Sequence, residues 1–406
     1  MAEAKRLADG ATGPLKGIRI LDMTSVVNGA YGTQILADQG AEIIKVEDPV
    51  GTRGGGGDIM RWSGHLPQGS APGMGPIFLT LNRNKRSVVL DLKDPKAKRA
   101  LMRLVKSCDA LVSSVRYEGM KRLGVDYEAV QAIKPDIVYV HAAGYGSNGP
   151  YAGEPAYDDL IQSASGCADV LPRTDGNETP RVLPTLLADK VSGLFLSQAV
   201  TAALLHRQRT GEGQFVEVPM LECVTSFLMV EHLFDHTFEP ATGALGYTRV
   251  LNPNRKPFKT KDGYIGLLPY TDKQWDQFFD IAGWGETIAK DPRFADYTTR
   301  NRNARELYAM VETVTQERTT AEWLELLKPL SIPVVRTNRL DELEADPHLA
   351  AVGMFELYEH PDVGPYKQMR PPVRFAKTPA NIRRHPPRLG QHTEEVLAEL
   401  SQDEDA

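Results

Sequence analysis

Short apolar runs alternate with amphipathic segments along the first third of the chain. Five runs rich in Ile, Val and Leu predict buried strands, at residues 17–23, 41–46, 87–92, 110–112 and 136–140. Residues 96–107 and 127–133, which lie between these runs, carry apolar positions at helical spacing. A strand, a helix and a second strand in succession form a β-α-β unit, whose strands lie parallel. The pattern therefore predicts an α/β fold with a Rossmann-like parallel sheet.

The character of the chain changes after the apolar helical segments near residues 190–235. Residues 239–275 are rich in Gly, Pro, Asn and Tyr, and they contain one predicted strand at 263–268. Helices are predicted at residues 273–281, 300–317 and 320–328, the last with a capping box at Thr319 and Glu322. The predicted domains are a large domain at residues 15–224, a smaller α+β domain at 225–330, and a C-terminal segment at 331–400 that returns to the large domain. Residues 1–14 are expected to be a disordered leader.

Composition and charge limit the classes of function. The 406 residues carry a formal net charge of −6, which argues against a general nucleic-acid or anionic-membrane binder. The three cysteines, Cys108, Cys167 and Cys223, are scattered, so they indicate neither a disulfide framework nor a zinc site and favour a reducing cytoplasm. The longest apolar stretch, residues 186–205, includes Asp189 and Lys190, and no membrane span is predicted.

Three short motifs suggest nucleotide or metal binding, but each lacks a necessary part. Gly144, Gly146 and Gly149 match a dinucleotide-binding pattern, yet Pro150 follows where a helix should receive the pyrophosphate. The glycine run 54–57 lacks the Gly-Lys-Ser/Thr ending of a phosphate-binding loop and is better explained as a surface loop. His232 and His236 are spaced to share one helix face, but no third ligand is evident, so paired histidines on an exposed or interface face are favoured over a metal site.

Asp189 is a lone acid in a segment, residues 182–195, that is almost entirely apolar or small. An acid among leucines costs desolvation free energy unless its charge is stabilised locally. Apolar positions from Val191 to His206 repeat at helical spacing, which places Asp189 at or just before a helix N-terminus. Free amides and the helix dipole would hold it in its charged form there. Two interpretations remain open at this point, an N-cap and a catalytic carboxylate.

Several segments taken in order along the chain resemble the class III CoA-transferase family, which includes carnitine, bile-acid and formyl-CoA transferases. The matching segments are residues 17–22, 34–47, 82–93, 122–124, 144–150, 209–214, 346–348 and 389–393. In that family a single Asp, in a segment resembling residues 187–193, is the nucleophile. The resemblance therefore implies that Asp189 is the catalytic residue.

The resemblance also implies the reaction and its participants. A CoA-transferase of this class moves CoA from an acyl-CoA donor to a carboxylic acid acceptor through an aspartyl mixed anhydride and an aspartyl-CoA thioester. Coenzyme A is a substrate here, and neither a prosthetic group nor a metal ion is expected. An intertwined homodimer in the cytoplasm is expected, with no nucleic-acid or membrane partner.

The family's binding residues map onto both predicted domains. The resemblance implies that CoA contacts Val27, Asn28, Leu90, Asp91, Lys93, Ser114, Val115, Arg116, Arg122, Ala143, Gly144 and Tyr145. Lys93 and Arg122 are the expected phosphate partners. Substrate contacts are expected at Gly243, Gly246, Tyr247 and Arg249 in the smaller domain. A polar cluster there, formed by Arg249, Asn252, Asn254 and Arg255, suggests recognition of a second carboxylate, as in a dicarboxylic acid.

Departures from the family pattern leave two further alternatives. Residues 113–118 read Ser-Ser-Val-Arg-Tyr-Glu where many members have Glu-Asn-Phe-Arg-Pro-Gly, and the long glycine loop of formyl-CoA enzymes is absent, so formate and oxalate are not the expected acceptors. Racemases of 2-methylacyl-CoA share the fold but place a His where this chain has Tyr157, and Tyr is a poor base near neutral pH. The other alternative is an acyl-CoA-binding relative without activity, against which the presence of Asp189 argues.

Overall fold

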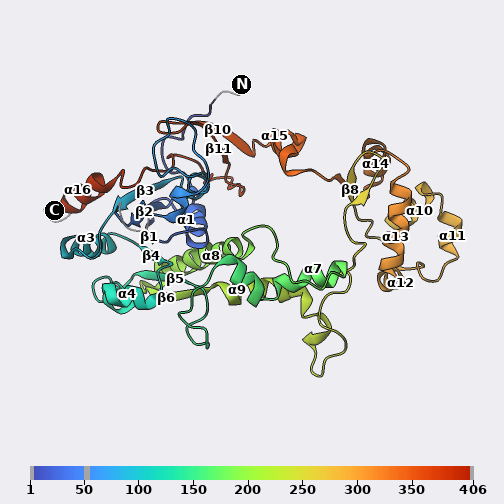
Figure 1. The fold of residues 1–406 in the computed structure, drawn as a ribbon, viewed down its shortest axis with the longest axis horizontal. Coiled ribbons are helices and arrows are strands. Elements are labelled where there is room, and N and C mark those ends of the chain that lie inside the picture. The colour runs from blue at the N-terminus through green and yellow to red at the C-terminus, as the bar shows by residue number, and fades with distance from the viewer. Residues whose placement is uncertain (1–3, 50–54, 403–406) are drawn as a thin grey trace. The chain divides into compact units, whose positions relative to one another are not determined.

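Six parallel strands form the centre of the first part of the protein in the computed structural model, which describes residues 4–49 and 55–402 (Figure 1). The strand order is β3-β2-β1-β4-β5-β6. The strands are β1 (Arg19–Met23), β2 (Glu42–Glu47), β3 (Lys85–Val89), β4 (Ala110–Ser113), β5 (Val138–Ala143) and β6 (Gln214–Pro219). Because the order reverses between β1 and β4, the carboxyl ends of these two strands mark a topological switch point, where α/β proteins bind ligands.

The chain divides into two compact units. The first comprises Met1–Cys167, Val182–Phe227 and His348–Ala406, and the second comprises Ala168–Arg181 and Leu228–Pro347. Helices with residues in the first unit are α1 (Asn28–Asp38), η1 (Ile59–Trp62), α2 (Pro76–Leu81), α3 (Pro95–Lys106), α4 (Tyr117–Leu123), α5 (Tyr127–Gln131), α6 (Asp158–Ala164), α8 (Leu187–Thr210), α15 (Pro347–Ala351) and α16 (Thr393–Gln402). Helices α7 (Cys167–Asp175) and α9 (Met220–His232) include residues of both units.

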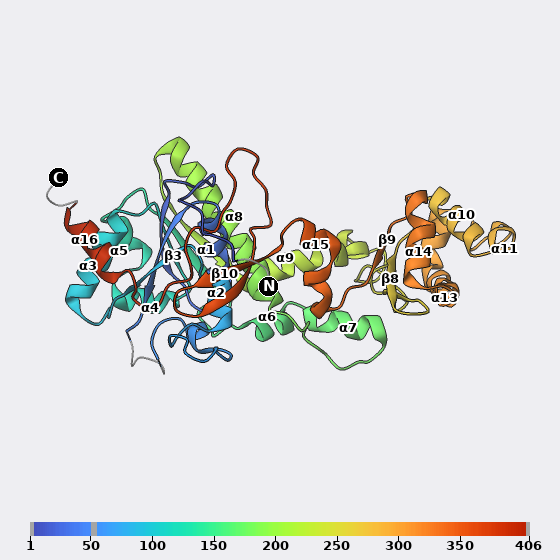
Figure 2. The ribbon, with the colours of Figure 1, turned by 90° about the horizontal axis from the view of Figure 1, so that it is seen from above.

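The sheet of the first unit is covered on both faces, which explains its continuous apolar runs. Successive residues of a strand point to opposite faces. Ile20 accordingly belongs to the core shared with Leu36 of α1 and Leu196 of α8. Its neighbour Leu21 belongs to the core formed with α3, α4, α5 and α16. Figure 2 shows the sheet between these two helical layers. The predicted α/β class with a parallel sheet is confirmed.

Two glycines bring α1 and α8 unusually close together. A Cβ atom placed on Gly32 would lie 2.6 Å from Cδ2 of Leu196. One placed on Gly193 would lie 2.8 Å from the carbonyl oxygen of Asn28. Any larger residue at either position would push the helices apart, so the N-terminal halves of α8 and α1 are held together by the absence of side chains.

The two ends of the chain pack against the first unit. The antiparallel pair β10 (Phe355–His360) and β11 (Gly364–Met369) precedes α16. The amide of Lys5 donates to Leu357 O at 2.7 Å, and that of Ala8 donates to Ile382 O at 3.0 Å. The expectation of a disordered leader is therefore wrong for residues 4–14, because backbone hydrogen bonds tie this segment to the C-terminal part of the chain. Residues 1–3 lie outside the described residues.

The second unit is a small α+β structure. Its antiparallel sheet contains β7 (Phe258–Lys259), β8 (Tyr264–Leu267) and β9 (Val334–Arg336). Its helices are η2 (Phe234–Thr237), α10 (Asp272–Ile281), α11 (Gly285–Ala289), α12 (Tyr297–Arg302), α13 (Ala304–Thr315), α14 (Thr320–Leu327), η3 (Lys328–Leu330) and η4 (Leu340–Ala345). The capping box of Thr319 and Glu322 is present at the start of α14.

The single helix predicted at residues 300–317 is two helices. The break falls at Asn303, whose Nδ2 donates to Thr299 O at 2.9 Å and to Arg293 O at 3.1 Å. An Asn side chain that bonds to nearby backbone carbonyls competes with helix continuation. None of the helices in residues 4–49 and 55–402 is long and apolar enough to cross a membrane.

Candidate active site

Asp189 lies in the first turn of α8, where only 8% of its surface is exposed. The helix begins at Leu187, so Asp189 is its third residue. The N-cap residue is Leu186, which makes no side-chain capping bond. The N-cap interpretation of Asp189 is therefore wrong by three residues. The apolar pattern could not show this, because the helix starts before the periodic run from Val191 that marked it.

The electrostatic environment of Asp189 also differs from expectation. Burial first, and then the nearby carboxylate of Asp158, raise the pKa of Asp189 to about 7. A hydrogen bond from the backbone of Asn28 acts in the opposite direction and lowers this pKa. The free amides and dipole at the helix N-terminus favour the charged carboxylate less than burial disfavours it. The expectation that they would hold Asp189 in its charged form is therefore not met. A carboxyl group poised near neutrality is typical of residues that do chemistry.

Asp158 is the neighbour that sequence reasoning missed. It is buried at the start of α6, and its Oδ1 accepts the backbone amide of Asp189 at 3.0 Å. Its Oδ2 accepts a hydrogen bond of 2.6 Å from Nε2 of Gln162. Gln162 Oε1 in turn accepts the amide of Leu183, in the segment that leads into α8. The signal was available in the sequence, because Asp158 follows Tyr157, the position compared with the racemase His, and Tyr157 itself is exposed.

Asn28 joins the loop after β1 to the start of α8. Its Nδ2 donates to Ser192 Oγ at 2.7 Å, and that hydroxyl donates to Ala188 O at 2.6 Å. The Oδ1 atom of Asn28 is buried and has no hydrogen-bond partner among the described residues. Asn28 and Asp189, both predicted site residues, are thus brought together by the packing of α1 on α8.

A buried ion pair fixes the loop that ends at Asn28. Val26 has a φ of 69°, a left-handed conformation that is costly for a β-branched residue. Its amide donates to Asp58 Oδ1 at 3.1 Å, and Lys45 Nζ donates to Thr24 O at 2.7 Å. Lys45 and Asp58 are 3.0 Å apart, and neither side chain is exposed. Burial alone would lower the pKa of Lys45, but the carboxylates of Asp58 and Asp22 outweigh it and raise that pKa.

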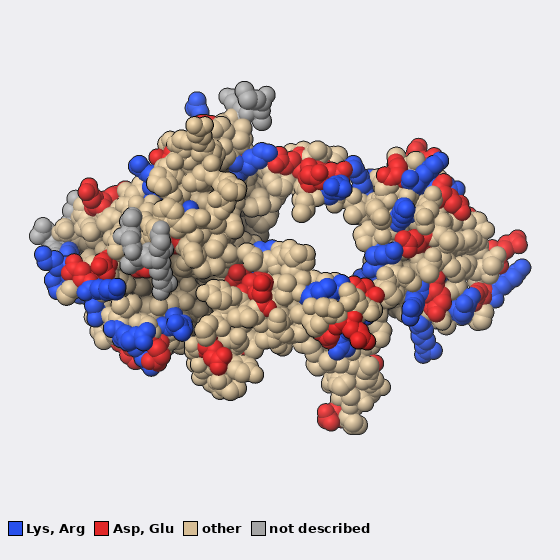
Figure 3. All heavy atoms as spheres, viewed as in Figure 1, with Lys and Arg blue, Asp and Glu red and all other residues tan. Residues whose placement is uncertain are grey.

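The other expected CoA contacts in the first unit follow the carboxyl ends of its strands. They are Val27 after β1, Leu90, Asp91 and Lys93 after β3, Ser114, Val115 and Arg116 after β4, Arg122 in α4, and Ala143, Gly144 and Tyr145 at the end of β5. Lys93, Arg116 and Arg122 are exposed cations. Lys and Arg side chains also gather over α3 and α4 on the face seen in Figure 3. The sheet topology therefore places the positions that directly follow the strands on the same edge, whereas Arg122 lies near the end of α4. The role of these residues in binding CoA stays a prediction.

The glycine-rich loop after β5 is occupied by the protein's own carboxylates. The amide of Gly146 donates to Glu222 Oε1 at 2.9 Å, and that of Ser147 donates to Glu217 Oε2 at 3.0 Å. These bonds use amides that a pyrophosphate would need, and the next helix begins only at Asp158. The glycine run also considered as a phosphate loop begins at Gly54, which lies outside the described residues. Its continuation at residues 55–57 forms a turn and bends in which Gly55 and Gly56 are buried, so the surface-loop interpretation is wrong for these two residues.

The expected substrate residues of the second unit belong to one loop, at residues 243–249. Gly246 has a φ of 104°, and its amide donates to His232 O at 2.8 Å. The amide of Tyr247 donates to His232 Nδ1 at 3.3 Å. The guanidinium of Arg249 lies 5.2 Å from the ring centroid of Tyr270. Gly243 belongs to the same loop, and its backbone lies close to the carboxylate of Asp235. All four belong to the second unit, whereas Asp189 belongs to the first.

The paired-histidine interpretation is also wrong. Helix α9 ends at His232, so His236 lies in the following 3₁₀ helix rather than on the same helix face. His232 is buried and accepts a backbone amide, which gives it a structural role. Within residues 4–49 and 55–402, no group of three or more His, Cys, Asp or Glu side chains is arranged to hold a metal ion.

All three cysteines are unpaired thiols with depressed reactivity. Burial raises the pKa of Cys108 to about 12 and that of Cys223 to about 11. The pKa of Cys167 is also raised, chiefly by burial. Because the thiolate is the nucleophilic form, none of these side chains is a candidate for covalent catalysis at neutral pH.

Solved structures of similar proteins have the same fold. A CAIB/BAIF family protein from Brucella suis is 28% identical and has a TM-score of 0.79, covering 96% of this chain and 100% of that chain. The orthorhombic form of Rv3272 from Mycobacterium tuberculosis is 30% identical, with a TM-score of 0.81 over 95% of this chain and 99% of that chain. The fold is therefore that of CAIB/BAIF proteins.

The sequence matches define the family. The pattern of CoA-transferase family III matches residues 15–393. A succinate–glutarate CoA-transferase from Agrobacterium fabrum is 31% identical over 95% of this chain and 96% of its own length. The mouse succinyl-CoA:glutarate CoA-transferase is 33% identical over 95% of this chain and 86% of its own length. A formyl-CoA:oxalate CoA-transferase from Afipia carboxidovorans is 31% identical over 95% and 93%, respectively. The chain belongs to CoA-transferase family III, which confirms the resemblance found in the sequence.

Proposed function

We propose that the protein transfers CoA from an acyl-CoA donor to a carboxylic acid acceptor, with Asp189 as the nucleophile. The observation that carries the proposal is the burial of Asp189 beside Asp158 and the backbone of Asn28. The carboxylate form of Asp189 is disfavoured by burial and by the neighbouring negative charge. Acylation makes the group neutral and removes both penalties, so the environment favours formation of the covalent intermediate.

The reaction proceeds by four exchanges at carbonyl carbon. The Asp189 carboxylate attacks the donor thioester, and its C–S bond breaks to give a mixed anhydride and CoA thiolate. The thiolate attacks the Asp189 carbonyl, which releases the donor acid and leaves an aspartyl-CoA thioester. The acceptor carboxylate attacks this thioester and expels CoA thiolate again. The thiolate then attacks the acceptor's acyl carbon, which releases the new acyl-CoA and restores the Asp189 carboxylate.

Backbone amides support the charge that develops on oxygen during each exchange. The amide of Asn28 already bonds to the Asp189 carboxyl group, and it is fixed by the loop that Asp58 and Lys45 hold. A donor that is fixed before reaction stabilises an oxyanion without a reorganisation cost. The phosphates of CoA would be held by Lys93, Arg116 and Arg122.

A dicarboxylic acid is the proposed acceptor. Two relatives are named for glutarate, and Arg249 stacks on Tyr270 without an ion-pair partner among the described residues. A guanidinium of this kind is suited to a second carboxylate. A relative of similar identity is named for oxalate, so the acceptor must be measured. Succinyl-CoA should be assayed with glutarate, oxalate and monocarboxylates, and Arg249→Ala should lower the preference for dicarboxylates.

A homodimer in the cytoplasm completes the proposal. Large apolar side chains on α8 and α9 are exposed in the single chain, among them Leu194, Leu205, Phe227 and Val230. Exposed apolar surface of this extent marks an interaction site. A second copy of the chain is the proposed partner, and sedimentation at micromolar concentration would detect it.

Trapping of the acyl enzyme tests the reaction. Incubation with succinyl-CoA followed by hydroxylamine should convert Asp189 to a hydroxamate that mass spectrometry locates. Asp189→Asn should lower turnover by at least about 10³-fold, whereas Asp159→Asn, a change at an exposed neighbouring acid, should not. Labelled CoA should exchange into the thioester in the wild type. Exchange of the α-proton with deuterated solvent, without CoA exchange, would instead support a racemase.

A further inference from the structure

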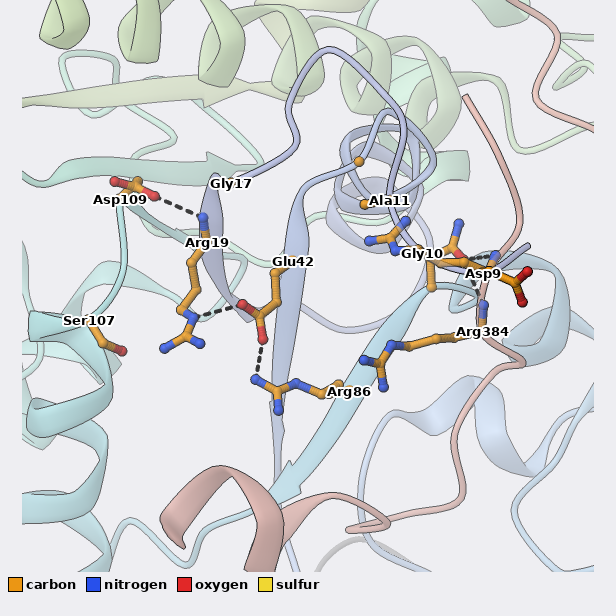
Figure 4. Close-up of a pocket in the computed structure, with 13 residues that line it drawn as sticks. Asp9, Gly10, Ala11, Gly17, Arg19, Glu42, Arg86, Ser107, Asp109 and Arg384 are labelled. Atoms are coloured by element: carbon orange, nitrogen blue, oxygen red, sulfur yellow. Dashed lines mark hydrogen bonds and ion pairs between the residues drawn. The ribbon is translucent and has the colours of Figure 1, made fainter. Parts of the chain in front are cut away.

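A cavity of about 910 Å³ lies at the edge of the sheet opposite to the candidate active site. Its walls include Arg19 and Glu42, the first residues of β1 and β2, and Arg86, the second residue of β3. These are the amino ends of the strands, whereas the expected CoA contacts follow the carboxyl ends. Figure 4 shows that the early segment around Asp9 and the C-terminal segment at Arg384 close one side of the cavity.

One half of the cavity has nearly balanced charge. Arg19 Nε donates to Glu42 at 2.8 Å, and Arg86 bonds to Glu42, Glu395 and Glu399. Only 4% of the Arg86 side chain is exposed, and its Nε has no hydrogen-bond partner among the described residues. This atom is itself buried and out of reach of a ligand in the cavity, and the other two guanidinium nitrogens of Arg86 already donate to the three carboxylates.

The other half of the cavity carries positive charge that no ion pair neutralises. Arg383 donates to two backbone carbonyls, those of Ala37 and Ala41, both at 2.7 Å. Within residues 4–49 and 55–402, neither Arg383 nor Arg384 forms an ion pair with a carboxylate. Burial, and then the charge of Arg384, lowers the pKa of Arg383, while the carboxylates of Asp38 and Glu42 act in the opposite direction. Figure 4 shows the exposed Arg384 side chain extended towards the strand that carries Arg86.

We infer that this cavity is a second ligand site, which binds a small phosphorylated molecule independently of the CoA-binding edge. Arg383 and Arg384 would hold the phosphate, because planar guanidinium groups pair well with its oxygens. Glu42 and Asp9 line the same cavity and would accept hydrogen bonds from hydroxyl or amino groups on the rest of the molecule. The volume is that of a site for a small organic ligand rather than for a single ion.

Binding of inorganic pyrophosphate, measured by isothermal titration calorimetry at constant ionic strength, tests this inference. Arg384→Ala should weaken binding at least about tenfold, because it removes a charge-assisted contact from an exposed side chain whose loss leaves the fold intact. Arg374→Ala is the matched control, since Arg374 is an exposed arginine of the same C-terminal segment that does not line the cavity. It should bind pyrophosphate like the wild type.

A second variant separates this cavity from the CoA-binding edge. Arg122→Ala should leave the high-affinity pyrophosphate site unchanged if that site is the cavity. The inference is overturned if Arg122→Ala weakens binding while Arg384→Ala does not, or if Arg374→Ala and Arg384→Ala weaken it equally. It is also overturned if pyrophosphate does not bind to the wild type.

Discussion

The backbone amide of Asp189 donates a 3.0 Å hydrogen bond to Oδ1 of Asp158, which brings two buried acidic residues of different helices together. One carboxylate thus positions the first turn of α8 while its charge opposes ionisation of the other. The same contact therefore fixes the geometry of the nucleophile and raises the pKa of its carboxyl group.

Asp158→Asn should shift the pH dependence of CoA transfer. Removal of the negative charge lowers the pKa of Asp189 from about 7, although burial still keeps it above the ordinary value. The acidic limb of kcat/KM should consequently move to lower pH, so that the variant keeps a larger fraction of its own maximal activity at pH 5.5. Initial rates measured from pH 5 to 9 would show the shift.

Asp159→Asn is the matched control for this experiment. Asp159 is an exposed acid on the same helix, and its side chain has no contact with Asp189 among the described residues. Its pH profile should coincide with that of the wild type. Equal shifts in the two variants would show that general surface charge, rather than the Asp158 contact, sets the acidic limb.

Asp189→Asn should stabilise the fold at alkaline pH. The folded-state pKa of about 7 exceeds the ordinary value of 3.8, so the folded state binds the proton more tightly than the unfolded state. The resulting contribution to stability is complete below pH 3.8 and is lost as the pH rises through about 7. The neutral amide avoids this loss, so the variant should gain at most about 4 kcal/mol relative to wild type between pH 4 and pH 8. Urea unfolding at both pH values measures the difference, and an equal gain at pH 4 would contradict the explanation.

Asp58→Ala should destabilise the protein and slow CoA transfer. It leaves the buried Lys45 without its ion-pair partner and releases the amide of Val26, at an expected cost of about 3–5 kcal/mol in the free energy of unfolding. The double variant with Lys45→Met should recover part of this stability, because no unpaired charge then remains buried. Recovered stability without recovered kcat would indicate that the loop before Asn28 acts by position.

Gly193→Ala should separate α1 from α8. The added methyl group would meet the Asn28 carbonyl oxygen at 2.8 Å and Tyr31 Cδ1 at 3.1 Å. We expect a loss of about 1–3 kcal/mol in stability, together with a fall in kcat because the Asn28 amide moves relative to Asp189. Gly119→Ala is a suitable stability control, since its methyl group would meet only a Val115 side-chain atom, at 3.2 Å.

Much of the fold could be predicted from the sequence because it depends on local apolar patterns. Strands β1 to β5 and helices α3 and α5 of the first unit were predicted within a few residues, although β3 begins at Lys85 rather than residue 87. Helices α2, α4, α6 and α16 and strands β10 and β11 were not predicted. Lys85 and Arg86 are buried and form ion pairs with Asp22 and Glu42. A search for apolar runs does not detect charged residues that are buried in this way. Strand β6 was missed because only one of its residues is buried.

The candidate site could be predicted only in part, for a related reason. The family resemblance pointed to Asp189 and Asn28, and the structure brings them together. Asp158 is distant in sequence and reaches Asp189 only through the packing of α6 on α8. The cavity at Arg384 is lined by residues of an early segment, of the sheet and of the C-terminal segment. No local sequence pattern predicts that these distant segments pack together.

The protonated cysteines have a consequence for an enzyme that works with activated acyl groups. An acyl group on its way between carboxylate and CoA could be diverted to any reactive sulfur of the polypeptide. Cys108 and Cys223 hold their protons at physiological pH. The chain is thereby protected from modifying itself during turnover, and alkylating reagents applied to the native protein should leave its catalytic capacity intact.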